Sequence, residues 1–487
     1  MEIYGLFSPD LIPSVREQWF NYLAKLDGLG IYYADHYEQC WITRHNKNKE
    51  LESIVSSYRK KGMDFIKKLD RRSMLVLLDY RNKILILKAD AVGHRILYYH
   101  SDKDAIYFST SLRLLTNDIT PALDKTALNC YLNLGYIPKE ITIFQNIRKL
   151  MPSHSLLYKN GKINIFKYCD IYKRPLSSPS SFYRKNLESR FKEVFTRFAD
   201  KKIGIMVSGG LDSSFLLRMA SLYSKRKITT FTFGSEAYLK GALAESRKIS
   251  ALFNTQHYEL APSLNDYLKY FTQAYKIIDE PVFDLDLPLI YYFLNFTKRL
   301  IDTLYHGFGS DEVFGGAPQD FIYQYRKFLR ICGSVNINHK NGILTLATYS
   351  SMLHRVPQAL NAHYKISNFF NTNLVFPYLD YDIVNLGFKM PEKLKIKNGT
   401  DKFFFRQMAQ YSLPKEFVFR KKLSAGIHAA WRKATVEVFR KDLNNFIDIK
   451  KITSGGKPSL SLLLKLILLM AWQEVIPKNE KGLNNHN

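Results

Sequence analysis

The sequence is poor in cysteine and has no apolar run long enough to span a membrane. Its four cysteines, at positions 40, 130, 169 and 332, form no CxxC pair and no cluster with histidine, so a structural zinc site or a disulfide framework is not indicated. The most apolar stretch, residues 460–472, is interrupted by Lys465 and is shorter than the roughly 20 residues of a spanning helix, so it predicts a buried C-terminal helix. The first ten residues lack the basic start and apolar run of a secretory signal, and we expect a cytoplasmic protein.

Acidic residues are few compared with basic ones. The 487 residues include 71 Lys and Arg against 44 Asp and Glu, a net charge of +27. This excess indicates an anionic ligand or partner, but does not distinguish a nucleotide from an acidic peptide, a nucleic acid or a membrane surface. Because the basic residues are dispersed and no RNA-binding module is visible, no clear nucleic-acid partner is expected. The 46% hydrophobic content excludes a disordered chain, and the length predicts more than one domain.

The sequence pattern changes near residue 175. Before it, apolar runs such as 73–79 and 83–88 predict a strand-rich domain with a hairpin. Residues 173–181 are rich in Pro and Ser and predict a linker between domains at 1–175 and 182–487. Beyond the linker, strands alternate with helices, which predicts a parallel sheet with helices on its faces, and the chain is mostly helical after residue 349.

The strongest chemical signal is the loop VSGGLDSS, residues 207–214, between a predicted strand at 202–207 and a predicted helix at 213–222. A helix N-terminus offers free N–H groups and partial positive charge to a phosphate. Glycines let the backbone approach such an anion closely, and serine hydroxyls can donate to it. Asp212 would repel a bare anion, so its presence implies a bridging cation, most simply Mg²⁺. The alternative is a tight turn without a ligand. The predicted phosphate-binding residues are Ser208, Gly209, Gly210, Leu211, Asp212, Ser213 and Ser214.

A second cluster, YHGFGSDEVFGG at residues 305–316, follows a predicted strand at 300–305. Ligands of open α/β sheets bind at the carboxyl ends of the strands. We therefore expect Asp311 to face Asp212 and to share the metal ion, with Gly309 beside the nucleotide. The end of the neighbouring strand, at Thr232, Phe233 and Gly234, is expected to line the adenine.

The loop at 207–214 resembles the pyrophosphate-binding loop of the ATP pyrophosphatase superfamily. Together with the blocks at 279–288, 305–316, 377–380, 402–406 and 420–422, it makes residues 185–475 similar to the synthetase domain of the asparagine synthetase family. Residues 87–99, 107–111 and 144–157 are similar to the glutaminase-type domain of that family. The resemblance implies an α/β protein of two domains. The first would be a glutaminase-like α+β sandwich, and the second an adenine-nucleotide α-hydrolase-like parallel sheet with a helical C-terminal part.

The sequence departs from the family at two places. Glutamine-hydrolysing members begin with Met-Cys, whereas this sequence has Glu2, and the family's glutamine-pocket motif is missing, so the first domain is expected to lack glutaminase activity. Phe308 stands where asparagine synthetases carry Glu and β-lactam synthetases carry Tyr. In these two departures the sequence resembles the branch of the family that lacks the cysteine nucleophile. The resemblance implies an AMP-forming amide ligase, and among the activities of that branch a lasso-peptide macrolactam cyclase is the best match. An asparagine synthetase using free ammonia, or a non-catalytic ATP-binding remnant, are the alternatives.

The resemblance also implies roles for single residues. ATP and Mg²⁺ would be bound, with Asp212 and Asp311 as metal ligands and Lys422 stabilising the charged transition state. The proton of the attacking amine would go to Glu280, Asp284, Asp286 or His306, and the sequence does not choose among them. Simpler roles remain open: a basic surface for Lys422, packing for His306 and a turn for Glu280. The expected partner is a peptide or small molecule bearing a carboxylate and an amine, together with a precursor-peptide protease or leader-binding protein.

Overall fold

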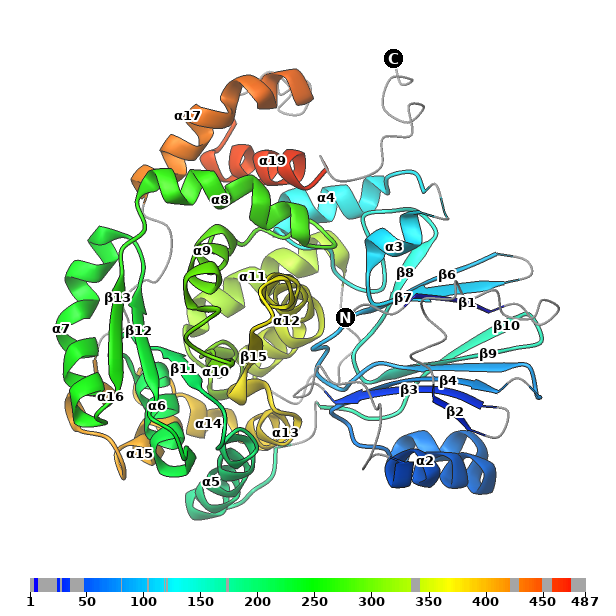
Figure 1. Ribbon diagram of the computed structural model, residues 1–487, viewed down its shortest axis with the longest axis horizontal. Helices are drawn as coiled ribbons and strands as arrows, with labels where there is room; N and C mark the ends of the chain where they lie inside the picture. Colours follow the sequence, from blue (N-terminus) through cyan, green and yellow to red (C-terminus); the bar gives the residue numbers. More distant parts are fainter. Residues whose placement is uncertain are drawn as a thin grey trace.

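In the computed structural model, the described residues are 4–7, 24–26, 29–35, 48–79, 81–102, 105–117, 119, 121–171, 175–333, 342–420, 429–448 and 458–473. They form two α/β units that pack side by side (Figure 1). The predicted domain boundary lies between the last strand of the first unit, which ends at Lys167, and a helix that begins at Ser180.

The first unit contains two antiparallel sheets that face each other (Figure 1). One sheet has the order β1 (Tyr4–Phe7), β7 (Ile106–Ser109), β6 (Leu97–Ser101), β8 (Ile147–Leu150). The other has the order β10 (Lys162–Lys167), β9 (His154–Lys159), β5 (Ile84–Lys88), β4 (Ser73–Asp79), β3 (Leu29–Asp35), β2 (Ala24–Leu26). The helices of this unit are α2 (Asn48–Lys61), η1 (Gly62–Lys68), α3 (Leu112–Thr116) and α4 (Lys125–Leu134).

Strand β4 shows why both faces of the larger sheet are covered. Its residues are all buried, and successive side chains of a strand point to opposite faces. Met74 and Val76 pack with Phe108 of the other sheet, whereas Leu75 and Leu77 pack with residues of α2 and η1. The continuous apolar run at 73–79 is therefore explained by burial on both sides.

The second unit is built on a parallel sheet of order β13 (Gln256–Leu260), β12 (Thr229–Phe233), β11 (Ile203–Met206), β14 (Thr303–Tyr305), β15 (Asn373–Val375). The predicted strands at 202–207 and 300–305 are confirmed as β11 and β14, and the neighbouring strand that was expected to end near Phe233 is β12. Because β11 has both β12 and β14 as neighbours, the loops that follow these three strands lie at one edge of the sheet.

Helices cover this sheet and make up most of the chain after residue 342 (Figure 1). They are α5 (Ser180–Thr196), α6 (Leu211–Tyr223), α7 (Glu236–Leu252), α8 (Leu264–Ile277), α9 (Leu287–Thr297), α10 (Ser310–Phe314), α11 (Pro318–Cys332), α12 (Ile343–Phe369), η2 (Pro377–Leu379), α13 (Tyr381–Lys389), α14 (Glu392–Lys395), α15 (Phe403–Ala409), α16 (Lys415–Val418), α17 (Ala429–Phe446) and α19 (Leu460–Gln473). The apolar C-terminal stretch forms α19, which is buried as predicted. Across the described ranges, no helix is both long and apolar enough to cross a bilayer.

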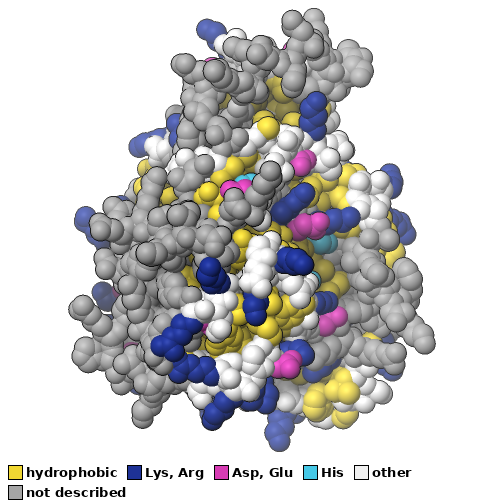
Figure 2. Space-filling model, turned by 90° about the vertical axis from the view of Figure 1, so that its right-hand side faces the viewer, with side chains coloured by type: hydrophobic (Ala, Val, Ile, Leu, Met, Phe, Trp, Pro, Cys, Tyr) yellow, Lys and Arg dark blue, Asp and Glu magenta, His cyan; other side chains and the backbone are white. Residues whose placement is uncertain are grey.

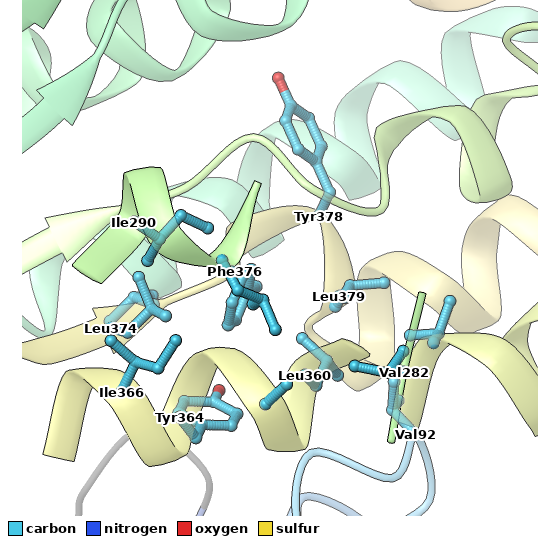
Figure 3. Close-up of a cluster of buried hydrophobic side chains, with 14 of the residues drawn as sticks. Val92, Val282, Ile290, Leu360, Tyr364, Ile366, Leu374, Phe376, Tyr378 and Leu379 are labelled. Atoms are coloured by element: carbon cyan, nitrogen blue, oxygen red, sulfur yellow. The ribbon is translucent and has the colours of Figure 1, made fainter. Parts of the chain in front are cut away.

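One apolar core joins the two units. Figure 3 shows Val92 of the first unit in the same cluster of buried side chains as Val282 and Leu360 of the second. Helix α19 contacts α4 of the first unit: the buried Lys465 ammonium donates to the Leu132 and Asn133 carbonyls at the end of α4, at 2.9 Å each. The face shown in Figure 2 carries Lys and Arg side chains at many separate points.

Candidate active site

The loop between β11 and α6 is held in place by its own serines and by Arg420. The Ser213 hydroxyl accepts from the Ser208 amide at 3.1 Å, and the Ser208 hydroxyl accepts from the Gly210 amide at 3.3 Å. The Arg420 guanidinium donates to the Ser208 carbonyl at 2.5 Å. Gly209 has a φ of +67°, and a Cβ atom there would lie 2.4 Å from Cβ of Glu245. The loop therefore needs glycine at 209, because α7 packs directly against it.

A cavity of about 620 Å³ opens at the carboxyl ends of β11, β12 and β14. Its volume lies in the range of small-molecule binding sites. Of the predicted phosphate-binding residues, the cavity is lined by Ser208, Gly210, Leu211, Asp212 and Ser213. Phe233, Gly234 and Gly309 also line it.

Three predicted residues lie behind the cavity wall. Gly209 and Ser214 are buried and are not among the lining residues, and the same holds for Thr232, whose hydroxyl donates to the Val207 carbonyl at 3.0 Å. The lining of the cavity therefore does not include these three of the residues that were predicted to contact the nucleotide. Lys422 lies outside the described residues, two positions after Arg420.

Asp212 and Asp311 converge on one cation, as predicted, but that cation is the ammonium of Lys402. Its Nζ lies 2.7 Å from both Asp212 carboxylate oxygens and 2.6 Å from Oδ1 of Asp311, and it donates to the Ser310 hydroxyl at 2.8 Å. Burial alone would lower the pKa of Lys402, but the two carboxylates raise it above its ordinary value. Lys402 therefore keeps its charge at neutral pH.

This convergence fits a magnesium ion. Both carboxylates lie within salt-bridge distance of a single positive group, so their negative charges act at one point. Carboxylate oxygens are ligands that Mg²⁺ prefers, and Mg²⁺ in phosphate sites is held by one or two of them together with the phosphates. Within the described residues, no group of three or more acidic, histidine or cysteine side chains forms a denser metal site.

His306 lines the cavity but is a poor proton acceptor. Burial, and next the charge of His363, lower its pKa to about 3, so its ring is neutral near pH 7. Its Nδ1 accepts from the Phe308 amide at 3.2 Å. In the neutral ring the proton is then on Nε2, which leaves no free lone pair to take a proton. The packing role of His306 is therefore the one that the geometry favours.

Glu280 lies at the contact between the two units rather than in the cavity. Its carboxylate is buried and pairs with Lys149 of the first unit at 3.2 Å, and the Ile143 amide donates to it at 3.2 Å. Burial raises the pKa of Glu280, although Lys149 opposes this shift. The cavity lining does not include Glu280, so the structure gives it an interdomain role instead of the predicted catalytic one.

Asp284 and Asp286 both line the cavity, just before α9 begins. Asp284 is hydrogen-bonded to Nε2 of His363 at 3.2 Å, and it accepts from the Asp286 amide at 3.1 Å. Burial, and next the charge of Asp284, raise the pKa of Asp286 to about 7. Burial would also raise the pKa of Asp284, but the His363 hydrogen bond and charge bring it below its ordinary value. The two neighbouring carboxyls thus titrate far apart.

Sequence reasoning gave no role to several charged residues of the cavity. Lys402 and Arg406 belong to the block at 402–406, which carries part of the family resemblance and could have identified them as site residues. Arg355 and His363 come from α12, where no motif marks them. Arg355 donates to the buried Glu312 at 2.5 Å and lies over the Phe308 ring at 5.8 Å. Phe308 packs edge-on against the Phe376 ring, with ring centroids 6.2 Å apart, and carries no titratable group.

Comparison with known proteins adds family matches in both units. The family described as asparagine synthase matches residues 195–341 and 338–446, which together are more than half of the chain. A glutamine amidotransferase domain matches residues 38–169.

Individual relatives are distant. A putative glutamine-hydrolysing asparagine synthetase 2 of Methanocaldococcus jannaschii is 28% identical over 305 residues, which are 58% of this chain and 58% of that relative. The glutamine-hydrolysing asparagine synthetase 1 of Bacillus subtilis is 22% identical, covering 78% of this chain and 71% of the relative. Among solved structures, the NH3-dependent NAD synthetase of Campylobacter jejuni is 10% identical with a TM-score of 0.24, over 61% of this chain and 95% of that chain.

Proposed function

The chain belongs to the asparagine synthase family, and we propose that it is an ATP-dependent ligase that adenylates a carboxylate and joins it to an amine. One observation carries this proposal: the phosphate-binding loop, the Asp212–Asp311 pair and the Asp284–Asp286 pair open into the same cavity. One part of the cavity can therefore bind a nucleotide and another part carries proton acceptors, and a single substrate molecule can reach both.

The cavity residues account for the first half of the reaction. Free N–H groups at the start of α6 and the hydroxyls of Ser208 and Ser213 bind the phosphates, and Phe233 and Gly234 face the adenine. Asp212 and Asp311 would hold Mg²⁺, which when bound offsets the negative charge that builds up on the phosphoryl oxygens. The substrate carboxylate attacks the α-phosphorus, pyrophosphate leaves, and an acyl-adenylate remains. Lys422 is proposed to stabilise this charge as well.

We further propose that the carboxylate and the amine belong to one molecule, so that the product is a macrolactam of the lasso-peptide type. The support is the aromatic part of the cavity lining, which includes Tyr136, Phe283, Phe308, Phe321 and Trp431. Such a lining suits a peptide better than it suits the small polar aspartate. Holding the two reacting groups of one molecule together also removes an orientation cost of about 7–11 kcal/mol.

A second candidate is an asparagine synthetase that uses free ammonia. It is favoured by the relatives, whose names are those of asparagine synthetases. Glutamine is not proposed as the ammonia source, because Glu2 stands where glutamine-hydrolysing members carry the cysteine nucleophile and the family's glutamine-pocket motif is missing from the sequence.

Pyrophosphate release separates the candidates. The protein is incubated with ATP and Mg²⁺, first with aspartate and ammonium, then with peptides that carry an acidic side chain and a free N-terminus. Peptide-dependent release is the expected result, and aspartate-dependent release would instead support the second candidate. No release with any carboxylate would contradict both. The Asp212→Ala variant should release none, because it lacks a metal ligand.

A further inference from the structure

We propose that Asp286, supported by Asp284 and His363, is the subsite for the attacking amine, which it binds as a primary alkylammonium and from which it accepts a proton. This inference rests on the proposed ligase function. It selects one residue among the four acceptors that the sequence left open, and it names the chemical class of the nucleophile.

Two tyrosines of α8 hold the backbone of the loop that carries Asp286. Tyr275 donates to the Asp284 carbonyl at 2.5 Å, and Tyr267 donates to the Leu285 carbonyl at 3.3 Å. A backbone held in this way places the neighbouring carboxyls in the cavity without the need for a ligand. Such support is what a group that must be positioned for catalysis requires.

Two side-chain groups of the subsite, the Asp286 carboxylate and Nδ1 of His363, have no hydrogen-bond partner among the described residues. Asp286 stands at the N-cap position of α9 but makes no side-chain cap bond, and in the described part of the chain no donor is recorded for its carboxylate. His363 is 4% exposed and lines the cavity. Its Nε2 faces the Asp284 carboxylate, and its buried Nδ1 has no partner among the described residues. An ammonium group has donors only, so it suits the acceptor oxygens of the Asp286 carboxylate.

The charges around Asp286 support the same role. It is faced by Asp284, by His363, by Arg432 of α17 and by the hydroxyls of three tyrosines, Tyr238 of α7 and Tyr267 and Tyr275 of α8. Burial and the Asp284 charge bring its pKa to about 7, while the charges of His363 and Arg432 act in the opposite direction. A general base works best when its pKa lies near the working pH. Asp284 stays ionised beside it and keeps the potential negative, which favours a cation.

The apolar side of the subsite points to an alkyl group on the amine. Trp431 lines the cavity and packs against Tyr267, with ring centroids 5.4 Å apart. An aromatic face near a cation adds attraction and accommodates methylene groups. A peptide N-terminus or a lysine side chain has both features, whereas free ammonia has only the charge.

The chemical step balances as follows. The bound ammonium first loses one proton to solvent, which leaves a neutral amine with a lone pair. The nitrogen attacks the acyl carbon, the C–N bond forms, and the bond from that carbon to the AMP oxygen breaks with its electron pair on AMP. The second nitrogen proton passes to the Asp286 carboxylate, and the products are an amide, AMP and a protonated Asp286, which returns its proton to solvent.

The test uses n-butylammonium as the probe and n-butanol as its neutral match. Binding to the full-length protein is measured by isothermal titration between pH 6 and pH 8. The wild-type affinity for the cation should rise with pH as Asp286 ionises, and Asp286→Asn should weaken it by about tenfold or more and remove the pH dependence, since a charge-assisted hydrogen bond is lost. The control is Asp200→Asn, at a side chain that is 75% exposed, which should behave as wild type.

Equal affinity of wild type and Asp286→Asn for n-butylammonium, in a variant with a native circular dichroism spectrum, overturns the proposal. So does a loss of n-butanol binding as large as the loss of cation binding, because the site would then recognise the alkyl chain alone. Failure of the ligase function would appear differently, as absent pyrophosphate release from the wild type with every carboxylate, while the binding data stand by themselves.

Discussion

Among single residues, Lys402 has the largest electrostatic role in the cavity. It is the positive group between Asp212 and Asp311, and its side chain is only 4% exposed. Replacing it leaves two carboxylates close together without a counter-charge. The residue thus offsets the repulsion between the two carboxylates, and the position that it occupies is attractive to any other cation.

The Lys402→Met variant should therefore lose stability when no metal is added. We expect a loss of about 3–5 kcal/mol, the usual cost of removing one partner of a buried ion pair. Adding Mg²⁺ should raise the melting temperature of the variant more than that of the wild type, because the ion compensates for the missing ammonium. Lys393→Met, at an exposed position of α14, is the control and should show neither effect. Equal responses to Mg²⁺ would contradict the metal assignment.

Asp286 should lower stability at the pH where it is ionised. Its pKa is raised in the folded state from 3.8 to about 7, so the folded protein favours the protonated form. The stability that this group contributes is present below pH 4 and is lost as the pH rises to 7. Asp286→Asn should therefore melt a few degrees above wild type at pH 8, and the difference should shrink toward pH 5 in scanning calorimetry. A difference independent of pH would show that the carboxyl does not titrate in this range.

The site residues that the sequence could predict are those inside contiguous motifs. Asp212 and Asp311 each follow a strand, and neighbouring parallel strands bring their ends together, so their meeting followed from the pattern. Lys402 comes 91 residues after Asp311, and no periodicity relates the two positions. For Glu280 the sequence instead suggested a catalytic role that the structure does not support. Its carboxylate belongs to a conspicuous motif, but it faces the first unit and not the cavity.

At the scale of elements, the turn from β11 into α6 depends on one glycine. Gly209 combines a positive φ with close contact to Glu245 of α7. Gly161 has a similar φ of +72°, but a Cβ atom there would meet nothing within 4 Å. An alanine at Gly161 would carry only the energetic cost of the left-handed backbone conformation. An alanine at Gly209 would carry that cost together with the cost of the close contact to Glu245.

Gly209→Ala should weaken ATP binding by at least about tenfold, because moving the loop by less than 1 Å already disturbs donors that must lie near 3 Å from the phosphates. Gly161→Ala should lose about 1 kcal/mol of stability from its left-handed conformation and bind ATP normally. Titration of both variants with ATP and thermal melting provide the measurements. Normal ATP binding by Gly209→Ala would exclude the loop from the phosphate site.

Elements with a clear pattern were predicted well, and those defined by tertiary contacts were not. The hairpin at 73–88 and the strand and helix between 202 and 222 appear close to their expected limits. Helix α2 ends at Lys61 and the chain continues as η1, because Gly62 adopts a φ of +52°, and no local pattern marks this change. Strand β15 has three residues and exists by pairing with β14, which no local pattern reveals.

At the scale of the whole molecule, the Lys149–Glu280 pair ties the two units together. Glu280→Gln leaves Lys149 buried without its counter-charge and should cost about 3–5 kcal/mol. Pyrophosphate release per folded molecule should be unchanged, because Glu280 does not line the cavity. Unfolding in urea and the release assay are the measurements.

The double variant Lys149→Met with Glu280→Gln is the matched control for this pair. It removes both charges and should recover much of the lost stability. If Glu280→Gln instead lost pyrophosphate release while its stability was unchanged, the Glu280 carboxylate would have a catalytic role after all.

The chain around the C-terminal end of α4 forms part of the cavity wall, so the first unit contributes to the site of the second. Leu134, Gly135 and Tyr136 line the cavity although they come from the first unit, and the Gly135 carbonyl accepts from the Phe283 amide at 2.7 Å. A synthetase half expressed alone would have a gap in its wall at this place. Chimaeras that exchange the first unit between homologues should consequently change which substrates are accepted, even when every residue that touches the nucleotide is kept.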